Sequence, residues 1–129
     1  MTSPTAAVTT RSTSLGILSF LTLALGLATA GIHLSLISAE FDKGATVYGT
    51  LFILTAAGYL LALAVMYLPV PALERFRTPA RLLLIGIALA AIISYIALGF
   101  YDSLGWVTKA IEAVLVVCAV AEMSRLRHR

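Results

Sequence analysis

The chain has 129 residues, of which 60% are hydrophobic and 12% charged, a formal net charge of +3 at pH 7 and a single cysteine. Soluble domains carry about 25% charged residues, so a water-soluble fold of this size has no means of hiding so much apolar surface, and lipid is the expected solvent. One cysteine excludes an intramolecular disulfide and a two-cysteine redox motif. The sparse positive charge is explained by membrane topology rather than by nucleic-acid binding.

Four apolar runs follow one another along the chain, and each is long enough to cross a bilayer, which takes about 20 residues. The predicted spans cover residues 15–39, 45–68, 79–100 and 104–123. Residues 1–14, rich in Thr and Ser, predict a disordered cytoplasmic tail, and residues 125–129 predict a basic one. Because short linkers make consecutive helices antiparallel neighbours, we expect an all-α membrane protein with an antiparallel four-transmembrane-helix bundle.

One alternative concerns the first apolar run. Arg11, an apolar stretch and then Ala28-Thr29-Ala30 resemble a secretory signal peptide with its small-residue cleavage site. Cleavage there would leave three spans. The run continues without a charge or a break as far as Ala39, and this continuity favours a first transmembrane helix.

The basic residues are distributed unevenly between the two ends of the predicted bundle. Seven arginines fall in the N-terminal tail, in the linker before the third span and its first residues, and at the C-terminus, whereas Lys43 and Lys109 fall on the other side. Cytoplasmic segments are enriched in Lys and Arg, so both termini are expected in the cytoplasm and the chain in the cell (plasma or inner) membrane. Such arginines attract anionic lipid headgroups, and we expect this of Arg75, Arg77, Arg81, Arg125, Arg127 and Arg129.

Each predicted span carries a line of small or polar residues at helical spacing. Steps of three, four and seven place the residues of one line on one helix face, and small residues let membrane helices approach closely. We therefore expect these lines to be the inward faces of the bundle. They run through Thr22, Gly26, Thr29, His33 and Glu40; Tyr48, Thr55, Tyr59 and Ala62; Gly86, Ala90, Ser94, Ala97 and Tyr101; and Gly105, Lys109, Glu112, Val116 and Ala119.

Three ionisable residues are expected at a similar depth in the membrane. His33 lies seven residues before Glu40, which places it about 10 Å from the outer end of the first span. Lys109 and Glu112 lie about 8 and 12 Å inside the start of the fourth. Ionisable side chains at that depth are costly unless paired or hydrated, and they mark functional sites by default. The candidate intramembrane polar site therefore consists of His33, Lys109, Glu112, Tyr48 and Ser94.

Three interpretations of this cluster remain open. In the first, Glu112 pairs with Lys109 three residues away, and a hydrogen bond from His33 makes the cluster a structural clip between the first and fourth helices. In the second, it is a binding or transport site in which a proton passes between His33 and Glu112. In the third, it contacts a partner protein. Glu122, near the inner end of the fourth span, is expected to pair with the arginine cluster.

The sequence indicates no enzyme and no cofactor. His33 is the only histidine in a span, and zinc or copper sites need two or more His or Cys at close spacing. A Ser–His–Asp set with a nucleophile elbow, a phosphate-binding glycine loop and a Cys–His pair are all missing from the sequence. We therefore expect no catalytic residues, no metal, no bound cofactor and no nucleic-acid partner.

In size and four-span plan, the chain resembles the small multidrug transporters, which work as dimers around one membrane-embedded glutamate. That family carries the glutamate in its first span, whereas here the first span holds His33 and Glu112 lies in the fourth. The resemblance is architectural, so neither the family nor its activity is assigned.

The function expected from these features is that of an accessory, scaffold or interaction subunit. It would pack in the lipid bilayer against copies of itself or against other membrane subunits. The alternative is a minimal transporter or channel with Glu112, His33 and Lys109 as its polar site. Because four helices enclose little space, this alternative needs at least a dimer. A weaker alternative is a haem- or quinone-binding membrane subunit that uses His33.

Overall fold

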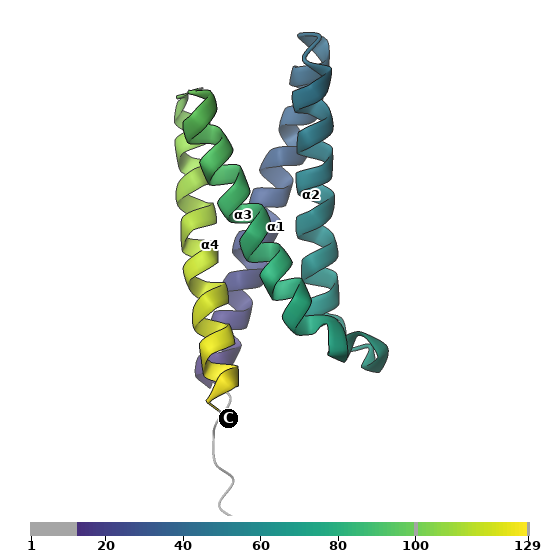
Figure 1. Cartoon of the computed structure of the whole chain (residues 1–129), viewed down its shortest axis with the longest axis vertical. Coiled ribbons are helices and arrows are strands. Elements are labelled where there is room, and N and C mark those ends of the chain that lie inside the picture. The colour runs from purple at the N-terminus through teal and green to yellow at the C-terminus, as the bar shows by residue number, and fades with distance from the viewer. Residues whose placement is uncertain (1–12, 100, 129) are drawn as a thin grey trace, which may run out of the picture.

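The computed structural model describes residues 13–99 and 101–128, and almost all of them are helical (Figure 1). Helix α1 spans Thr13–Asp42, α2 Thr46–Tyr67, α3 Arg77–Leu98 and α4 Ser103–Arg127, and a short 3-10 helix, η1 (Pro71–Phe76), precedes α3. All four α-helices, α3 together with η1, are long and apolar enough to cross a membrane. The all-helical fold with four candidate spans, predicted from composition and run length, is thereby confirmed.

Helices α4 and α3 end at other residues than the sequence predicted, because the residues at their C-terminal ends favour a longer or a shorter helix. Helix α4 continues through Arg125 to Arg127, beyond the predicted end at 123, because cationic side chains are favourable in the last turn of a helix. Helix α3 ends at Leu98, and the next residue, Gly99, has a φ of 73°. This is the left-handed conformation in which a glycine commonly ends a helix. Residues 13 and 14 of the predicted tail belong to α1, and residues 1–12 lie outside the described residues.

The four helices form a ring in which each packs against two others. Backbone contacts join α1 to α2 and α4, and α3 to α4 and α2, but α1 makes none with α3 and α2 none with α4. We call the end with the α1–α2 and α3–α4 turns the hairpin end, and the end with the start of α1, η1 and the last turn of α4 the terminal end. Figure 1 shows α1 and α3 crossing, so that α1 meets α2 at the hairpin end and α4 at the terminal end.

The core lies toward the terminal end, and the two hairpins part toward the other end (Figure 1). Within the described part of α3, no residue after Ala88 is buried, and the first buried residue of α4 is Thr108. Beyond that level each hairpin packs within itself. A Cβ added to Gly49 would meet the Phe41 ring at 2.8 Å, and one added to Gly105 would collide with Tyr95.

The predicted inward face is wrong for α3. On α1, α2 and α4, residues of the predicted lines, such as Thr29, Tyr59 and Ala119, are buried. On α3 the predicted line is exposed, and a Cβ added to Gly86 would meet nothing within 4 Å. Small residues allow close approach without requiring it, and the side of α3 that faces the bundle was decided by its partners. Its buried residues are Ala80, Arg81, Leu84 and Ala88.

Candidate functional site

Glu112 is the centre of a polar cluster about midway along α4. Its side chain is fully buried. The hydroxyl of Thr29 on α1 donates to Oε1 at 3.1 Å, and that of Tyr59 on α2 donates to the same oxygen at 3.2 Å. The ammonium group of Lys109, one turn earlier on α4, donates to Oε2 at 2.5 Å. We call Glu112, Lys109, Thr29, Tyr59 and His33 the hairpin-side layer.

His33 completes this layer from α1. Its Nε2 lies 3.8 Å from Glu112 Oε1, and its Nδ1 lies 2.8 Å from the main-chain oxygen of Thr29. The edge of the ring meets the ring of Phe52 at a centroid distance of 5.6 Å, and Tyr59 lies at 6.0 Å. The structure thus brings together the three ionisable residues that sequence analysis singled out, His33, Lys109 and Glu112.

Ser94 and Tyr48 were the other two predicted members of the site. Ser94 is exposed on α3, because the part of α3 beyond Ala88 lies outside the common core, so its assignment to the cluster is corrected. Tyr48 is half-buried in the first turn of α2, one turn nearer the hairpin end than Phe52.

The two hydroxyl groups that reach Glu112 were not predicted as members of the cluster. Thr29 and Tyr59 stood on the predicted lines, but nothing in the sequence separated them from the other small and polar residues there. One usable signal was the spacing of Thr29 and His33, which are four residues apart and therefore share a helix face.

A second carboxylate, Glu122, lies ten residues further along α4 and has contacts from all three other helices. Arg81 on α3 donates to Oε1 at 3.0 Å, Ser19 on α1 donates to Oε1 at 3.2 Å, and Tyr67 on α2 donates to Oε2 at 3.0 Å. We call these four residues, together with the buried Thr22, the terminal-side layer. Glu122 pairs with an arginine, as the sequence predicted, but Tyr67 and Ser19 were not predicted to take part.

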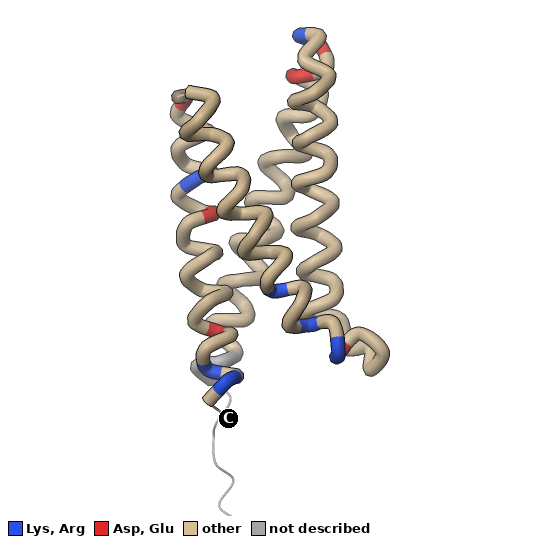
Figure 2. The backbone as a smooth tube through the Cα atoms, in the orientation of Figure 1, with Lys and Arg blue, Asp and Glu red and all other residues tan. Residues whose placement is uncertain are grey.

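Arg81 corrects the expectation that all the inner arginines meet lipid headgroups. It is only 7% exposed, and its guanidinium points into the bundle toward Glu122. Arg75, Arg125 and Arg127 are exposed near the terminal end, where Figure 2 shows most of the basic residues gathered. Arg77 is half-buried, and Arg129 lies outside the described residues.

An apolar core separates the two layers. Ten residues along a helix correspond to about 15 Å, and on α4 this interval contains the fully buried Leu115 and Ala119. Leu63 and Met66 of α2 and Leu84 of α3 belong to the same hydrophobic cluster. The two polar layers are therefore separate clusters.

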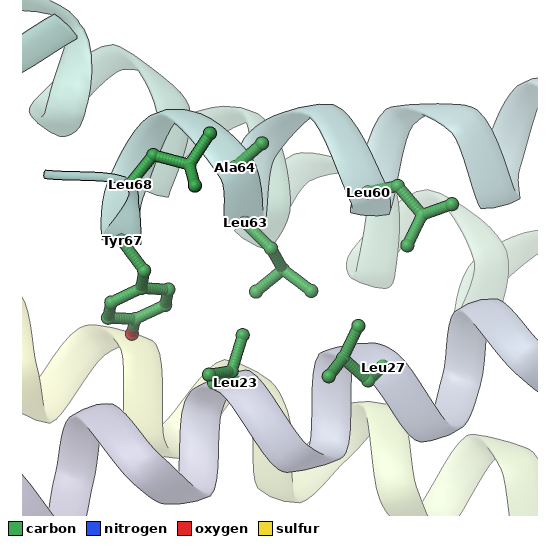
Figure 3. A pocket seen from close by; sticks show the side chains of 7 residues that line it. All are labelled: Leu23, Leu27, Leu60, Leu63, Ala64, Tyr67 and Leu68. Atoms are coloured by element: carbon green, nitrogen blue, oxygen red, sulfur yellow. The ribbon is translucent and has the colours of Figure 1, made fainter. Parts of the chain in front are cut away.

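The structure also shows an apolar groove of about 370 Å³ between α1 and α2. Figure 3 shows its leucines, with Leu23 and Leu27 from α1 facing Leu60 and Leu63 from α2, and the hydroxyl of Tyr67 turned away toward α4. Neither Glu112 nor Glu122 lines the groove, so the groove offers hydrocarbon surface and no access to either carboxylate. Its remaining lining residues are Ala64, Tyr67 and Leu68.

Among residues 13–99 and 101–128, no three His, Cys, Asp or Glu side chains gather closely enough to hold a metal ion. No protein-family model, curated protein or solved structure matches the chain. By its fold and its amino-acid composition, the chain belongs to the class of small all-helical proteins with four candidate membrane spans.

Proposed function

We propose that the chain is an accessory or interaction subunit of a membrane complex and acts through the outward faces of its helices. The observation that carries this proposal is that both buried carboxylates are used inside the bundle. Glu112 joins α4 to α1 and α2, and Glu122 joins α4 to α1, α2 and α3. Buried polar groups that are hydrogen-bonded between several helices make a fold rigid and specific, which is what a scaffold requires.

The short connections support the same proposal. The turns between helices are residues 43–45 and 99–102, and the α2–α3 linker is mostly the short helix η1. The described part of the chain therefore has little surface outside its four helices, and contact with other proteins falls to their apolar faces. Large exposed side chains such as Phe20, Ile93 and Val117 are suited to lipid or to helices of a partner.

Purification of the tagged chain at its native expression level, in a mild detergent or a lipid-retaining polymer, tests this proposal. Quantitative mass spectrometry is expected to find one or more membrane subunits at a fixed ratio to the chain. A tagged four-helix membrane protein of similar size, purified in parallel, supplies the background. Recovery of the chain alone, as a clean homo-oligomer, contradicts the proposal.

We further propose that the terminal end faces the cytoplasm, in the cell membrane, with the exposed arginines against anionic lipid headgroups. The gathering of arginines at that end (Figure 2) supports this orientation, since cytoplasmic segments are rich in Lys and Arg. A membrane-impermeant maleimide applied to intact cells is expected to label Lys43→Cys and not Arg125→Cys, both in a Cys118→Ala background. The reverse labelling contradicts the orientation.

A second candidate function is transport by an oligomer. It is favoured by the place of the hairpin-side layer, at the level beyond which the two hairpins part, with the Lys109 side chain still 12% exposed. Liposomes containing the purified protein are expected to carry a proton or cation flux that Glu112→Gln abolishes and the exposed control Ser94→Ala retains. Flux no greater than in protein-free liposomes rejects this function.

A further inference from the structure

The hydrogen bond at Nδ1 of His33 fixes which ring nitrogen carries the proton. The main-chain oxygen of Thr29, 2.8 Å away, is a carbonyl oxygen and only accepts, so Nδ1 must be the N–H donor. In a neutral imidazole the other nitrogen then has a free lone pair. For His33 that nitrogen is Nε2, which faces Oε1 of Glu112 at 3.8 Å.

Two acceptors therefore face each other across this gap. A nitrogen lone pair and a carboxylate oxygen do not hydrogen-bond, and 3.8 Å exceeds the usual 2.7–3.2 Å for N–H···O bonds. A proton on Nε2 changes this pair into a charge-assisted hydrogen bond, which is stronger and shorter than a neutral one. A proton on Nε2 therefore turns an unfavourable contact between two acceptors into a favourable one.

We propose that Nε2 of His33 is a proton-binding site, and that binding a proton there exchanges the cation paired with Glu112 from Lys109 to His33. The proton comes from a hydronium ion, whose O–H bond breaks and leaves a water molecule, while one N–H bond forms at Nε2 and the contact between Lys109 and Glu112 is given up. Proton binding at Nε2 is independent of the chain's role as a subunit, because the site is the same whether the chain transports a solute or only packs against partners.

The charges around Glu112 explain the exchange. One carboxylate and one ammonium balance in the resting layer, so a proton on His33 brings the net charge to +1 in a buried place. Like charges a few ångströms apart repel strongly where water is excluded. Of the two cations, Lys109 has the freedom to leave, because its long side chain is partly exposed and can extend toward the membrane surface.

The surroundings of Lys109 and His33 are consistent with this movement. The Lys109 ammonium lies 5.6 Å from the centre of the Tyr95 ring on α3, toward the hairpin end, and an aromatic face attracts a cation. From α2, Tyr59 donates to Glu112 and Phe52 meets the His33 ring by its edge. The charged groups that the structure places against His33 are thus Glu112 and Lys109, both from α4.

Nitrogen-15 NMR of the histidine ring, in lipid bilayers, tests the site directly. A His128→Gln background leaves His33 as the single histidine. At high pH the neutral ring is expected to carry its proton on Nδ1, and acidification is expected to give an imidazolium in one transition. In the same sample the Lys109 ammonium signal is expected to change with the same midpoint pH. A neutral ring protonated on Nε2, or a Lys109 signal that does not respond, overturns the proposal.

Two variants test the coupling. Lys109→Met is expected to raise the midpoint pH of His33 by about one unit or more, roughly a tenfold gain in proton affinity, because one nearby positive charge is gone. Glu112→Gln is expected to lower it. The matched control is Lys43→Met, which removes an exposed lysine paired with Glu40 and is expected to leave the midpoint unchanged. An unchanged midpoint pH of His33 in Lys109→Met overturns the coupling. If a variant fails to fold, the response of the Lys109 ammonium signal in the otherwise unsubstituted protein tests the coupling instead.

Discussion

Both buried carboxylates lie on α4, but their neutralising cations reach them by different routes. Glu112 is paired with Lys109, one turn away on the same helix, whereas Glu122 is paired with Arg81 from α3. The first pair forms as soon as α4 is helical, and the second forms only when α3 docks on α4. One layer therefore has a local charge pair with hydroxyl groups from two other helices, and the other has a charge pair that itself joins two helices.

The layers also differ in which polar atoms lack a hydrogen-bond partner. In the terminal-side layer, the Nε of Arg81 and the hydroxyl of Thr22 are buried without a hydrogen-bond partner. A buried water molecule takes up such spare donors when it has two or more polar partners. In the hairpin-side layer, Nε2 of His33 faces Oε1 of Glu112 at 3.8 Å without a hydrogen bond. The atom without a hydrogen bond in the hairpin-side layer is thus an acceptor, Nε2 of His33, whereas in the terminal-side layer Arg81 has an unused donor.

The largest effect is expected from Arg81→Met. The substitution leaves Glu122 buried without its cation and removes the ion pair between α3 and α4, which is expected to cost about 3–5 kcal/mol of unfolding free energy. Denaturant titration in mixed micelles measures it. Because a buried pair can be replaced by apolar residues at little cost, the double variant Arg81→Met/Glu122→Leu is expected to recover most of the loss. A double variant as unstable as the single one would show that Arg81 acts through packing alone.

A smaller loss, about 2 kcal/mol, is expected from Lys109→Met. Glu112 again loses a cation, and an unpaired buried group costs about 1–3 kcal/mol or more when charged. Thr29 and Tyr59 still hold the helices together, so α4 keeps its contacts with α1 and α2. The same denaturant titration, compared directly with Arg81→Met, tests the distinction between local and inter-helix pairs. A larger loss of unfolding free energy in Lys109→Met than in Arg81→Met would contradict this distinction.

Packing between the layers is tested without changing any charge. Gly26 lies on α1 between Thr22 and Thr29, and a Cβ there would meet Leu63 Cδ1 at 2.8 Å. Gly26→Ala is expected to destabilise the bundle by about 1–2 kcal/mol, as overpacked cores do. Gly86→Ala, on the exposed face of α3, is the matched control and is expected to be neutral or slightly stabilising. Thermal unfolding of both variants in one detergent measures the difference, and equal melting temperatures would refute it.

The smallest effects are expected from removing one hydroxyl group in each layer. Tyr59→Phe and Tyr67→Phe each delete one hydrogen bond to a glutamate, and such bonds in membrane proteins contribute about 0.6 kcal/mol on average. Tyr59→Phe is expected to cost less than Lys109→Met, and Tyr67→Phe less than Arg81→Met. Denaturant titration again gives the values. A tyrosine variant as damaging as the loss of its layer's cation would make the hydroxyl, not the cation, the main partner of that glutamate.

The fold was largely predictable because membrane spans are encoded locally. Apolar runs of about 20 residues predict helices without knowledge of their neighbours, and the polar cluster followed from depth along two of those runs. His33, Lys109 and Glu112 were found because an ionisable residue in an apolar span is conspicuous. Tyr59 and Tyr67 were not, since a tyrosine in such a span is as easily an interface residue or part of the packing as a hydrogen-bond donor.

The face of α3 was not predictable from spacing. The line through Gly86, Ala90 and Ser94 had the same periodicity as the lines that proved to be buried, and in a membrane a small-residue face is tolerated against lipid as well as against a helix. The burial of Arg81 instead of its exposure to headgroups was decided by the same rotation of α3. With that rotation, Arg81 meets Glu122, which is 41 residues away in the chain.

The sequence by itself determined the class of the molecule, its number of long helices, their approximate ends and the positions of His33, Lys109 and Glu112 along them. These properties depend on run length, composition and helical rise, which need no tertiary contact. Only the tertiary structure decided which hydroxyl groups meet each carboxylate, which face of α3 is buried and which ring nitrogen of His33 faces Glu112. Those depend on how the helices rotate and cross, and such rotations are fixed when side chains from all four helices pack together.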